Sequence, residues 1–518
     1  MAEMQVGGLC QTHSTIRERW LRLDRFEHGV LFVAALILIY QITIPPIVGL
    51  IDNGDFFHLM SPAGFRHVSE KPEDMNVFFN SKFLFEKPGL LETHYISSEL
   101  LIARVARVIG PILSKDGLFD IRVLGLMHAA LLFSGIALII SAHSKLRKPS
   151  RWILSLLLVW IFTDVGYVSF FNSFYAQTAS PLFLVLTAGF FALLVSKDDK
   201  KWTYFATFYF AALLFICSKP QEAPQGVLLA VIVFLAARAL RTRWVKTLGV
   251  VSVAVMLMFA ALCYVSSPTG VKNNSLYNAV FGDLLKNSPD PAADLAELKL
   301  SNDLLKYVGT HAFIKDSPVP QDWFKAAFYQ KVRHEDLLGF YMRHPSRLWK
   351  LITRRSAKAF TLVTHYGNFE KRSGFPPGTK SSAFKIWSDF KEKVFPGSPW
   401  TLVVLFFGNI AAVALLLIRD RKSGDSWHLR LSAFGILNLM AVGAFLTSTL
   451  GDGTLDIVRQ LFTFNAMTDL CLIGDVVFLI EAITRKIQKL TLYRLYAKPL
   501  GDGRGNVEAC RVQSNLPS

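Results

Sequence analysis

The sequence predicts an all-α polytopic membrane protein with about ten transmembrane helices and a mainly helical outer domain. Three observations lead to this fold class. The 518 residues are 52% hydrophobic with a mean hydropathy of +0.35, which is too apolar for an ordinary soluble protein. Several apolar runs reach the roughly 20 residues needed to span the hydrocarbon core of a bilayer. Lys and Arg are concentrated in alternate connections between these runs.

The apolar runs predict ten spans with approximate boundaries. They lie near residues 29–50, 120–142, 152–170, 176–196, 202–218, 223–240, 247–266, 400–418, 431–448 and 456–482. No cleavable signal peptide is expected, because the first 28 residues are polar and the first apolar run is long and lacks a small-residue cleavage site.

The distribution of positive charge predicts the orientation. The N-terminal tail, four short connections and the C-terminal tail are rich in Lys and Arg. The alternate connections FNSFYAQ, SKPQEAPQ and TSTLGDGTLD contain one positive residue, Lys219. Since positively charged loops stay in the cytoplasm, both termini are expected there, in a plasma (inner) membrane protein. The net charge of +17 then reflects this asymmetry and contact with anionic lipid, and no nucleic-acid partner is expected.

This topology divides the chain into five parts. Residues 1–28 form a cytoplasmic tail, and residues 29–266 hold seven spans. Residues 267–399 form an extracytoplasmic domain, residues 400–482 hold three further spans, and residues 483–518 form a basic cytoplasmic tail.

The first outer loop, residues 51–118, opens with two carboxylates, Asp52 and Asp55, in the motif DNGD. The Asn-Gly pair between them tolerates positive φ, so a tight turn that aims both side chains at one region is expected. The two phenylalanines that follow would desolvate Asp55, raise its pKa and strengthen it as a base. We predict Asp55 as the general base and Asp52 as its support. The structural alternative is a simple helix stop at the interface.

Later in the same loop, the run YISSELLIARVARVIGPIL has its apolar residues mainly on one helical face. This pattern predicts an amphipathic helix lying in the outer interface. A short membrane-dipping hairpin is the alternative.

Cationic side chains are expected on the same side of the membrane. Lys219 and Gln221 lie on either side of Pro220, which ends a span and leaves both side chains at the interface. A snorkelling lysine that anchors the end of the helix is the alternative. Arg459 lies about a turn into the last span, where arginine is costly unless it is paired or faces a polar cavity. A guanidinium there suits a phosphate. An ion pair with Asp456 or Asp452 is the alternative.

Other polar residues have structural explanations. Asn465 and Asp469 share a helical face, which favours hydrogen bonds between helices over catalysis. Asp164 within the third span is ambiguous. The basic stretch 344–358 suits contact with lipid phosphates. The five cysteines have no paired spacing and indicate neither a disulfide framework nor a zinc site.

Together, the outer residues describe a site with a carboxylate base and cations for an anionic leaving group. The sequence has no GxGxxG or GxxxxGK[ST] motif near a strand, which argues against a nucleotide substrate. A sugar activated on a polyprenyl phosphate fits: the base removes a proton from an acceptor hydroxyl, and the cations stabilise the departing phosphate.

At these motifs the chain resembles the GT-C membrane glycosyltransferases and, more narrowly, bacterial surface-glycan hexosyltransferases that use polyprenyl-phosphate sugars. The resemblance rests on Asp52, Asp55, Asn172, Ser173, Lys219, Gln221, His344, Pro345, Asp452 and Arg459. It implies substrate-binding roles for Asn172 and Asp452 beside Lys219, Gln221 and Arg459. Gln177 stands where relatives often place an acid.

The resemblance implies a hexosyltransferase that acts at the extracytoplasmic face. Its partners are a polyprenyl-phosphate sugar donor, a glycan or glycolipid acceptor, and membrane lipids. No cofactor is certain, and a divalent metal is possible because some GT-C enzymes need one. A transporter or flippase of lipid-linked oligosaccharide is the alternative, for which internal repeats and deep polar residues are the expected signs. A non-catalytic membrane scaffold is the third functional hypothesis.

Overall fold

The computed structural model describes residues 23–496, except for positions 70, 72–75, 90–95, 115, 198–200, 239, 241–242, 423, 452 and 454–455. Within the described part, a helix coincides with each of the ten expected spans. These helices are α2 (Arg25–Thr43), α6 (Arg122–Ala142), α7 (Lys148–Phe162), α9 (Ala179–Ser196), α10 (Lys201–Ile216), α11 (Gln225–Arg238), α12 (Val245–Val265), α20 (Gly408–Arg419), α21 (Asp425–Gly451) and α23 (Phe462–Tyr496).

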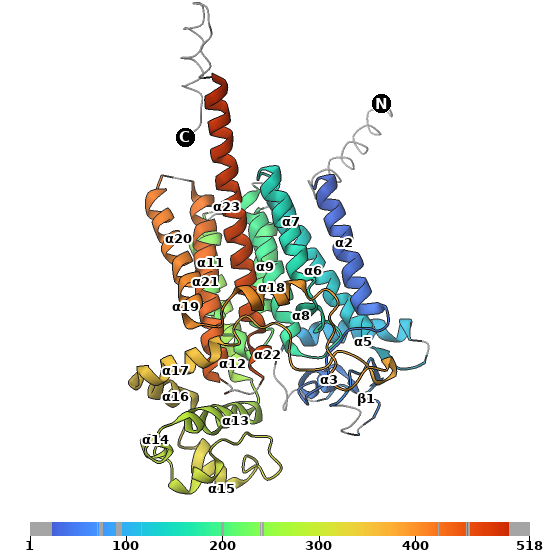
Figure 1. Ribbon diagram of the computed structural model, residues 1–518, viewed down its shortest axis with the longest axis vertical. Helices are drawn as coiled ribbons and strands as arrows, with labels where there is room; N and C mark the ends of the chain where they lie inside the picture. The colour runs from blue at the N-terminus through green and yellow to red at the C-terminus, as the bar shows by residue number, and fades with distance from the viewer. Residues whose placement is uncertain are drawn as a thin grey trace, which may run out of the picture.

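The helices form one bundle along the long axis of the molecule (Figure 1). Six helical stretches of the described chain are long and apolar enough to cross a membrane by themselves, and α10 and α11 are shorter apolar helices. The predicted helical polytopic membrane fold is therefore confirmed. α2 begins and α23 ends at the same end of the bundle. We call this end, where α2 begins and α23 ends, the opposite end of the bundle. The small sheet and the helical domain described below lie at the other end.

Several spans differ from their expected limits. The third was expected over 152–170, but α7 ends at Phe162. The first was expected to reach residue 50, but α2 ends at Thr43 because Pro45 and Pro46 follow it. The last was expected over 456–482. Its beginning forms the short helix α22 (Ile457–Gln460), and α23 then continues well past the apolar stretch into basic sequence.

The first outer loop contains a small sheet that the sequence did not reveal. Strands β1 (Phe65–His67), β2 (Lys82–Phe85) and β3 (Phe119–Asp120) pair antiparallel in the order β1-β2-β3. Phe65 lies opposite Phe85, and Phe83 lies opposite Phe119. Strands of two to four residues are too short to show the alternating pattern of a strand.

Two helices flank this sheet. α3 (Phe57–Ala63) directly follows the DNGD turn, and α5 (Ser98–Leu113) is one 16-residue helix rather than a hairpin. On α5, Ala103 and Ala106 are fully buried, whereas Leu101 and Val108 are exposed. Exposed apolar residues on one face are what a helix in the membrane interface presents.

The segment 267–399 divides between two hydrophobic cores. A small helical domain has its own core between Leu276 and Leu351. Its helices are α13 (Thr269–Tyr277), α14 (Pro291–Glu297), α15 (Asp322–Phe324), α16 (His334–Arg343) and α17 (Pro345–Ser356). We call this end of the bundle the domain end (Figure 1). After α17 the chain returns to the bundle, where Phe360 and Trp387 join the main core, and α18 (Ile386–Val394) and α19 (Pro399–Leu402) follow.

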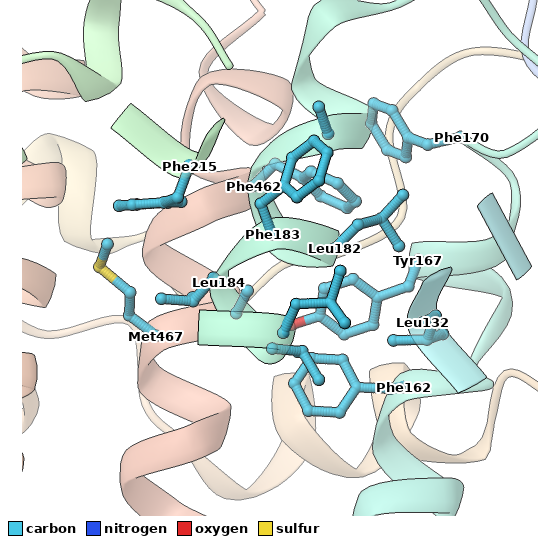
Figure 2. Packing of buried hydrophobic residues seen from close by; sticks show 14 of the residues in the cluster. Leu132, Phe162, Tyr167, Phe170, Leu182, Phe183, Leu184, Phe215, Phe462 and Met467 are labelled. Atoms are coloured by element: carbon cyan, nitrogen blue, oxygen red, sulfur yellow. The ribbon is translucent and has the colours of Figure 1, made fainter. Parts of the chain in front are cut away.

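Buried aromatic and aliphatic side chains pack together inside the bundle (Figure 2). The rings of Phe170 and Phe462 stack at 4.0 Å between centroids, and Phe162 packs 5.2 Å from Tyr167. Tyr167 belongs to the short helix α8 (Val165–Val168) between α7 and α9. This packing joins the α8 segment to the start of α23.

α18 is anchored in the bundle by buried polar contacts. Lys391 Nζ lies 2.6 Å from Asp469 Oδ1 on α23, and neither side chain is exposed. Asp469 Oδ2 also accepts from Tyr167 Oη at 2.6 Å and from Trp387 Nε1 at 3.0 Å. Asp469 therefore has the structural hydrogen-bonding role that its place in the sequence favoured.

Asp164 makes a second anchor. Its Oδ2 accepts from the Ser388 amide at 3.0 Å, and its Oδ1 accepts from the Gly166 amide at 2.8 Å. Asp164 therefore caps α8 and holds the start of α18. The two anchors fix the end of the loop between α17 and α18.

Candidate functional site

The two carboxylates of the DNGD turn point to different partners. Asp52 is 6% exposed, and its Oδ1 accepts from the Gly54 amide at 2.7 Å and the Phe56 amide at 3.1 Å. Its Oδ2 lies 2.9 Å from His67 Nε2 on β1. Gly54 has φ +100°, a conformation that glycine adopts easily. Asp52 thus ties the turn together and fixes it to the sheet.

Asp55 faces away from these contacts and pairs with the far end of the chain. Its Oδ2 lies 2.5 Å from Arg459 Nη1 on α22. Arg459 also pairs through Nε with Asp456 and lies 4.8 Å above the Tyr175 ring. Arg459 is only 5% exposed, whereas 38% of the Asp55 side chain is accessible. The carboxylate can therefore be reached from outside while its cation is held in place.

The expectation that apolar neighbours raise the pKa of Asp55 is wrong. Burial does act in that direction, but the Arg459 guanidinium, with His58 and Lys219, outweighs it and lowers the pKa of Asp55. Phe57 is half exposed and contributes little apolar cover. In this state Asp55 is firmly ionised.

Asp456 is a functional candidate that the sequence suggested only as an ion-pair partner. Its Oδ2 accepts from Tyr366 Oη at 2.7 Å, and Asn53 Nδ2 donates to the same tyrosine oxygen at 2.8 Å. Its Oδ1 is buried and accepts no hydrogen bond from the described residues. His365, which is 66% exposed, has Nδ1 3.9 Å from that oxygen. The loop before α18 thus brings a tyrosine and a histidine to the DNGD turn.

Lys219 is a second cation in this cluster. Lys219 Nζ donates to Gln460 Oε1 at 2.6 Å. With its amide oxygen turned toward the donors around it, Gln177 accepts from Lys219 Nζ at 3.1 Å and from Arg459 Nη1 at 3.3 Å. Gln177 therefore stands between the two cations.

The remaining sequence candidates lie farther from this cluster. Gln221 Nε2 donates to Ser448 Oγ at 3.2 Å. Asn172 is fully buried, and its Nδ2 donates to the carbonyls of Ile42 at 3.2 Å and Val48 at 2.7 Å. These two contacts secure the chain after α2, and a substrate-binding role for Asn172 stays a prediction. Asp452 lies outside the described residues.

The polar cluster that the structure assembles consists of Asp55, Arg459, Asp456, Lys219, Gln177, Tyr366 and Asn53. In the described part of the chain, no three His, Cys, Asp or Glu side chains are grouped so that they could hold a metal ion. Asp55 and Asp456 share Arg459 instead. Chemically, the cluster offers an accessible carboxylate, two cations for a phosphate and several hydrogen-bonding groups for a hydroxylated substrate.

Comparison with known proteins gives one family match. A family model described as "YfdI N-terminal transmembrane domain" matches residues 20–494. No curated protein matches the sequence.

Two solved structures show remote similarity. One is the archaeal oligosaccharyltransferase AglB from Archaeoglobus fulgidus in complex with an inhibitory peptide and a dolichol-phosphate, with 14% identity and a TM-score of 0.39 over 95% of this chain. The other is an Archaeoglobus fulgidus oligosaccharyltransferase in the apo form, with 13% identity and a TM-score of 0.39 over 94% of this chain. The chain covers 53% of each of these longer proteins.

Proposed function

The chain belongs to the family of the YfdI N-terminal transmembrane domain, a GT-C-like family, and on this premise we propose that it is a membrane glycosyltransferase. It moves a sugar, a hexose, from a polyprenyl-phosphate donor to a cell-surface glycan or lipid-linked acceptor at the extracytoplasmic face. The observation that carries this proposal is the accessible Asp55 carboxylate held against Arg459, with Lys219 nearby.

In the proposed reaction, Asp55 accepts the proton of the acceptor hydroxyl. The acceptor oxygen forms a bond to the anomeric carbon of the sugar, and the bond from that carbon to the phosphate oxygen breaks. The polyprenyl phosphate leaves with the electron pair of this bond. Arg459 and Lys219 stabilise the charge that develops on the phosphate.

The ion pair in the unliganded site gives donor binding a second effect. Arg459 lowers the pKa of Asp55 while the two are paired. A donor phosphate that engages Arg459 would offset this cation with its own negative charge. The pKa of Asp55 would then rise, and its strength as a base would increase when the donor is in place.

The location of the cluster also supports a lipid-linked donor. α22 and the DNGD turn lie at the domain end of the bundle, where α6 and α9 begin and α21 ends (Figure 1). A lipid phosphate lies at the ends of membrane spans, so it would reach the cations without leaving the bilayer.

The direct test combines the purified full-length protein with a synthetic polyprenyl-phosphate hexose as donor. The acceptor is glycan isolated from cells that lack the gene. We expect transfer from the lipid donor and none from a nucleotide hexose. Mass spectrometry of surface glycans with and without the gene should show the loss of one hexose. Movement of a fluorescent lipid-linked sugar across vesicles without any transfer would favour the flippase alternative instead.

Replacing Arg459 by Lys is expected to lower kcat/KM for the donor about 10- to 100-fold, since hydrogen bonds to charged groups contribute about 1.5–3 kcal/mol. Lysine keeps the positive charge, but it lacks the planar guanidinium with which arginine can donate to a phosphate and to Asp55 at the same time. Lys219→Gln should mainly raise the donor KM. Initial rates of transfer, measured over a range of donor concentrations, give kcat and KM for each variant. Wild-type kinetics in Arg459→Lys and Arg459→Ala would leave Arg459 with a purely structural role.

The proposed orientation predicts which positions a membrane-impermeant thiol reagent reaches in intact cells. The background replaces Cys10 and Cys510 by Ser, while Cys217, Cys263 and Cys471 are buried. A cysteine at exposed position 380, in the loop before α18, should react from outside.

Cysteines at exposed positions 148 and 246, at the opposite end, should react only after the cells are permeabilised. Labelling of 148 and 246 in intact cells, with 380 protected, would reverse the orientation and place the site in the cytoplasm.

A further inference from the structure

A large cavity opens at the opposite end of the bundle, away from the candidate site. It lies between α7 and α9 on one side and α20, α21 and α23 on the other, with a volume of about 1450 Å³. It extends from Ser196, at the end of α9, inward to Thr187 and Asn409. Pockets for small molecules usually measure about 300–1,000 Å³, so this cavity suits a larger ligand.

The inner walls are mainly apolar. Leu158, Ala188, Leu437, Met440 and Ile473 are among the residues that line them. The main polar side chains at the inner end satisfy one another: Asn409 Nδ2 donates to Asn438 Oδ1 at 3.1 Å and to Asp475 Oδ2 at 3.0 Å. Walls of this kind favour hydrocarbon over water, and inside a bilayer hydrocarbon comes from lipid chains.

The mouth is basic. Arg419, Arg421, Lys422, Arg430 and Arg485 line it, against the carboxylates Asp420 and Glu481.

Both of these carboxylates already have cationic partners. Asp420 Oδ1 lies 2.9 Å from Arg419 Nε, and Glu481 Oε1 lies 2.6 Å from Arg147 Nη1 and 3.1 Å from Arg485 Nε. They therefore do not neutralise the other three cations at the mouth.

These three cations are Arg421, Lys422 and Arg430. Arg421 and Lys422 are exposed and form no ion pair with any residue in the described part of the chain. Arg430 Nη2 donates to neutral acceptors, Ser196 Oγ at 2.9 Å and the Val195 carbonyl at 3.3 Å. Positive charge therefore remains available where the apolar cavity meets the end of the bundle.

We propose that this cavity binds an anionic phospholipid. Its acyl chains fill the apolar interior, and its phosphate headgroup lies against Arg421, Lys422 and Arg430. The charge at the mouth selects an anionic headgroup over a zwitterionic one, and the apolar depth selects a lipid over a soluble phosphate. In the predicted orientation this lipid belongs to the cytoplasmic leaflet, whereas the sugar donor would bind at the other end of the bundle.

The test measures lipid retained by the purified full-length protein after delipidation and exposure to equal amounts of phosphatidylglycerol and phosphatidylcholine. Native mass spectrometry counts the bound molecules. We expect retention of phosphatidylglycerol in preference to phosphatidylcholine. In the variant Arg421→Gln/Lys422→Gln/Arg430→Gln the affinity for phosphatidylglycerol should fall about 100-fold, since each basic residue near an anionic lipid surface contributes ~1 kcal/mol.

A matched control removes three charges at the same end of the bundle but outside the cavity, by Arg238→Gln/Arg243→Gln/Lys246→Gln, and should retain the lipid. Equal loss in the control, or equal retention of both lipids by the wild type, would overturn the proposal. A second variant, Ala188→Phe, fills the cavity and leaves its mouth intact. It should lose one bound lipid, and an unchanged lipid count would show that the chains lie elsewhere. Thermal unfolding midpoints confirm that the variants are folded.

Discussion

Replacing Asp55 by Asn is expected to reduce sugar transfer about 10²- to 10⁴-fold, the usual range for loss of a general base. Asparagine keeps the shape of the side chain and can still accept a hydrogen bond from Arg459, but it cannot take the proton of the acceptor hydroxyl. The side chain is 38% exposed, so the folded protein should tolerate the change. Transfer rates of purified variants, at matched amounts of folded protein, provide the measurement.

Two further carboxylates serve as controls. Asp52→Asn should reduce activity less, because among the described residues Asp52 pairs with His67 and accepts from backbone amides. Asp456→Asn tests the other carboxylate on Arg459, whose buried Oδ1 accepts no hydrogen bond from the described residues. If Asp55→Asn keeps near wild-type activity while Asp456→Asn is inactive, Asp456 is the base. Should all three variants stay active, the DNGD turn has only a structural role.

The pH dependence provides a separate test of Asp55. Because Arg459 lowers the pKa of Asp55 in the free protein, the acid limb that Asp55 gives kcat/KM should lie below the ordinary aspartate pKa of about 3.9. The acid limb of kcat reports the donor complex, in which the phosphate offsets Arg459. It should therefore lie at higher pH than the limb of kcat/KM. Coincident limbs would contradict an activation of Asp55 by the donor.

The membrane architecture could be predicted because it depends on local properties. Span length and hydropathy follow from the thickness of the bilayer, and the positions of the ten helices agree with them. The nearness of Asp55, Lys219 and Arg459 was also predictable in part, because each lies at the end of a span on the same predicted side. Their separation in sequence did not matter once the spans were placed.

The errors come from contacts between distant segments. The pKa of Asp55 was judged from its phenylalanine neighbours, whereas Arg459, about 400 positions away, controls it. The contacts of Asn172 are likewise distant in sequence, because its amide donates to two carbonyls of the segment around the end of α2. Tyr366 was missed because its approach to Asp456 depends on a loop whose path only the tertiary structure defines.

That loop is held at its end by the buried pair between Lys391 and Asp469, and breaking this pair is expected to have the second large effect. Lys391→Met leaves the Asp469 carboxylate buried without its cation. Removing one partner of a buried pair costs about 3–5 kcal/mol, because the remaining charge is uncompensated. The variant should unfold at a clearly lower temperature in detergent.

Its activity should fall as well, since a displaced α18 loosens the loop that brings Tyr366 and His365 to Asp456.

The same helix offers a matched control. Lys385 forms a partly exposed pair with Asp389 at 2.9 Å, one turn apart. Lys385→Met should change the free energy of unfolding by only about 0.5 kcal/mol, as is usual for such pairs. The double variant Lys391→Met/Asp469→Asn should recover much of the loss, because the amide oxygen can still accept from Tyr167 and Trp387 and no buried charge remains. If the double variant is no more stable than Lys391→Met, packing of the lysine chain, and not charge pairing, anchors α18 to the bundle.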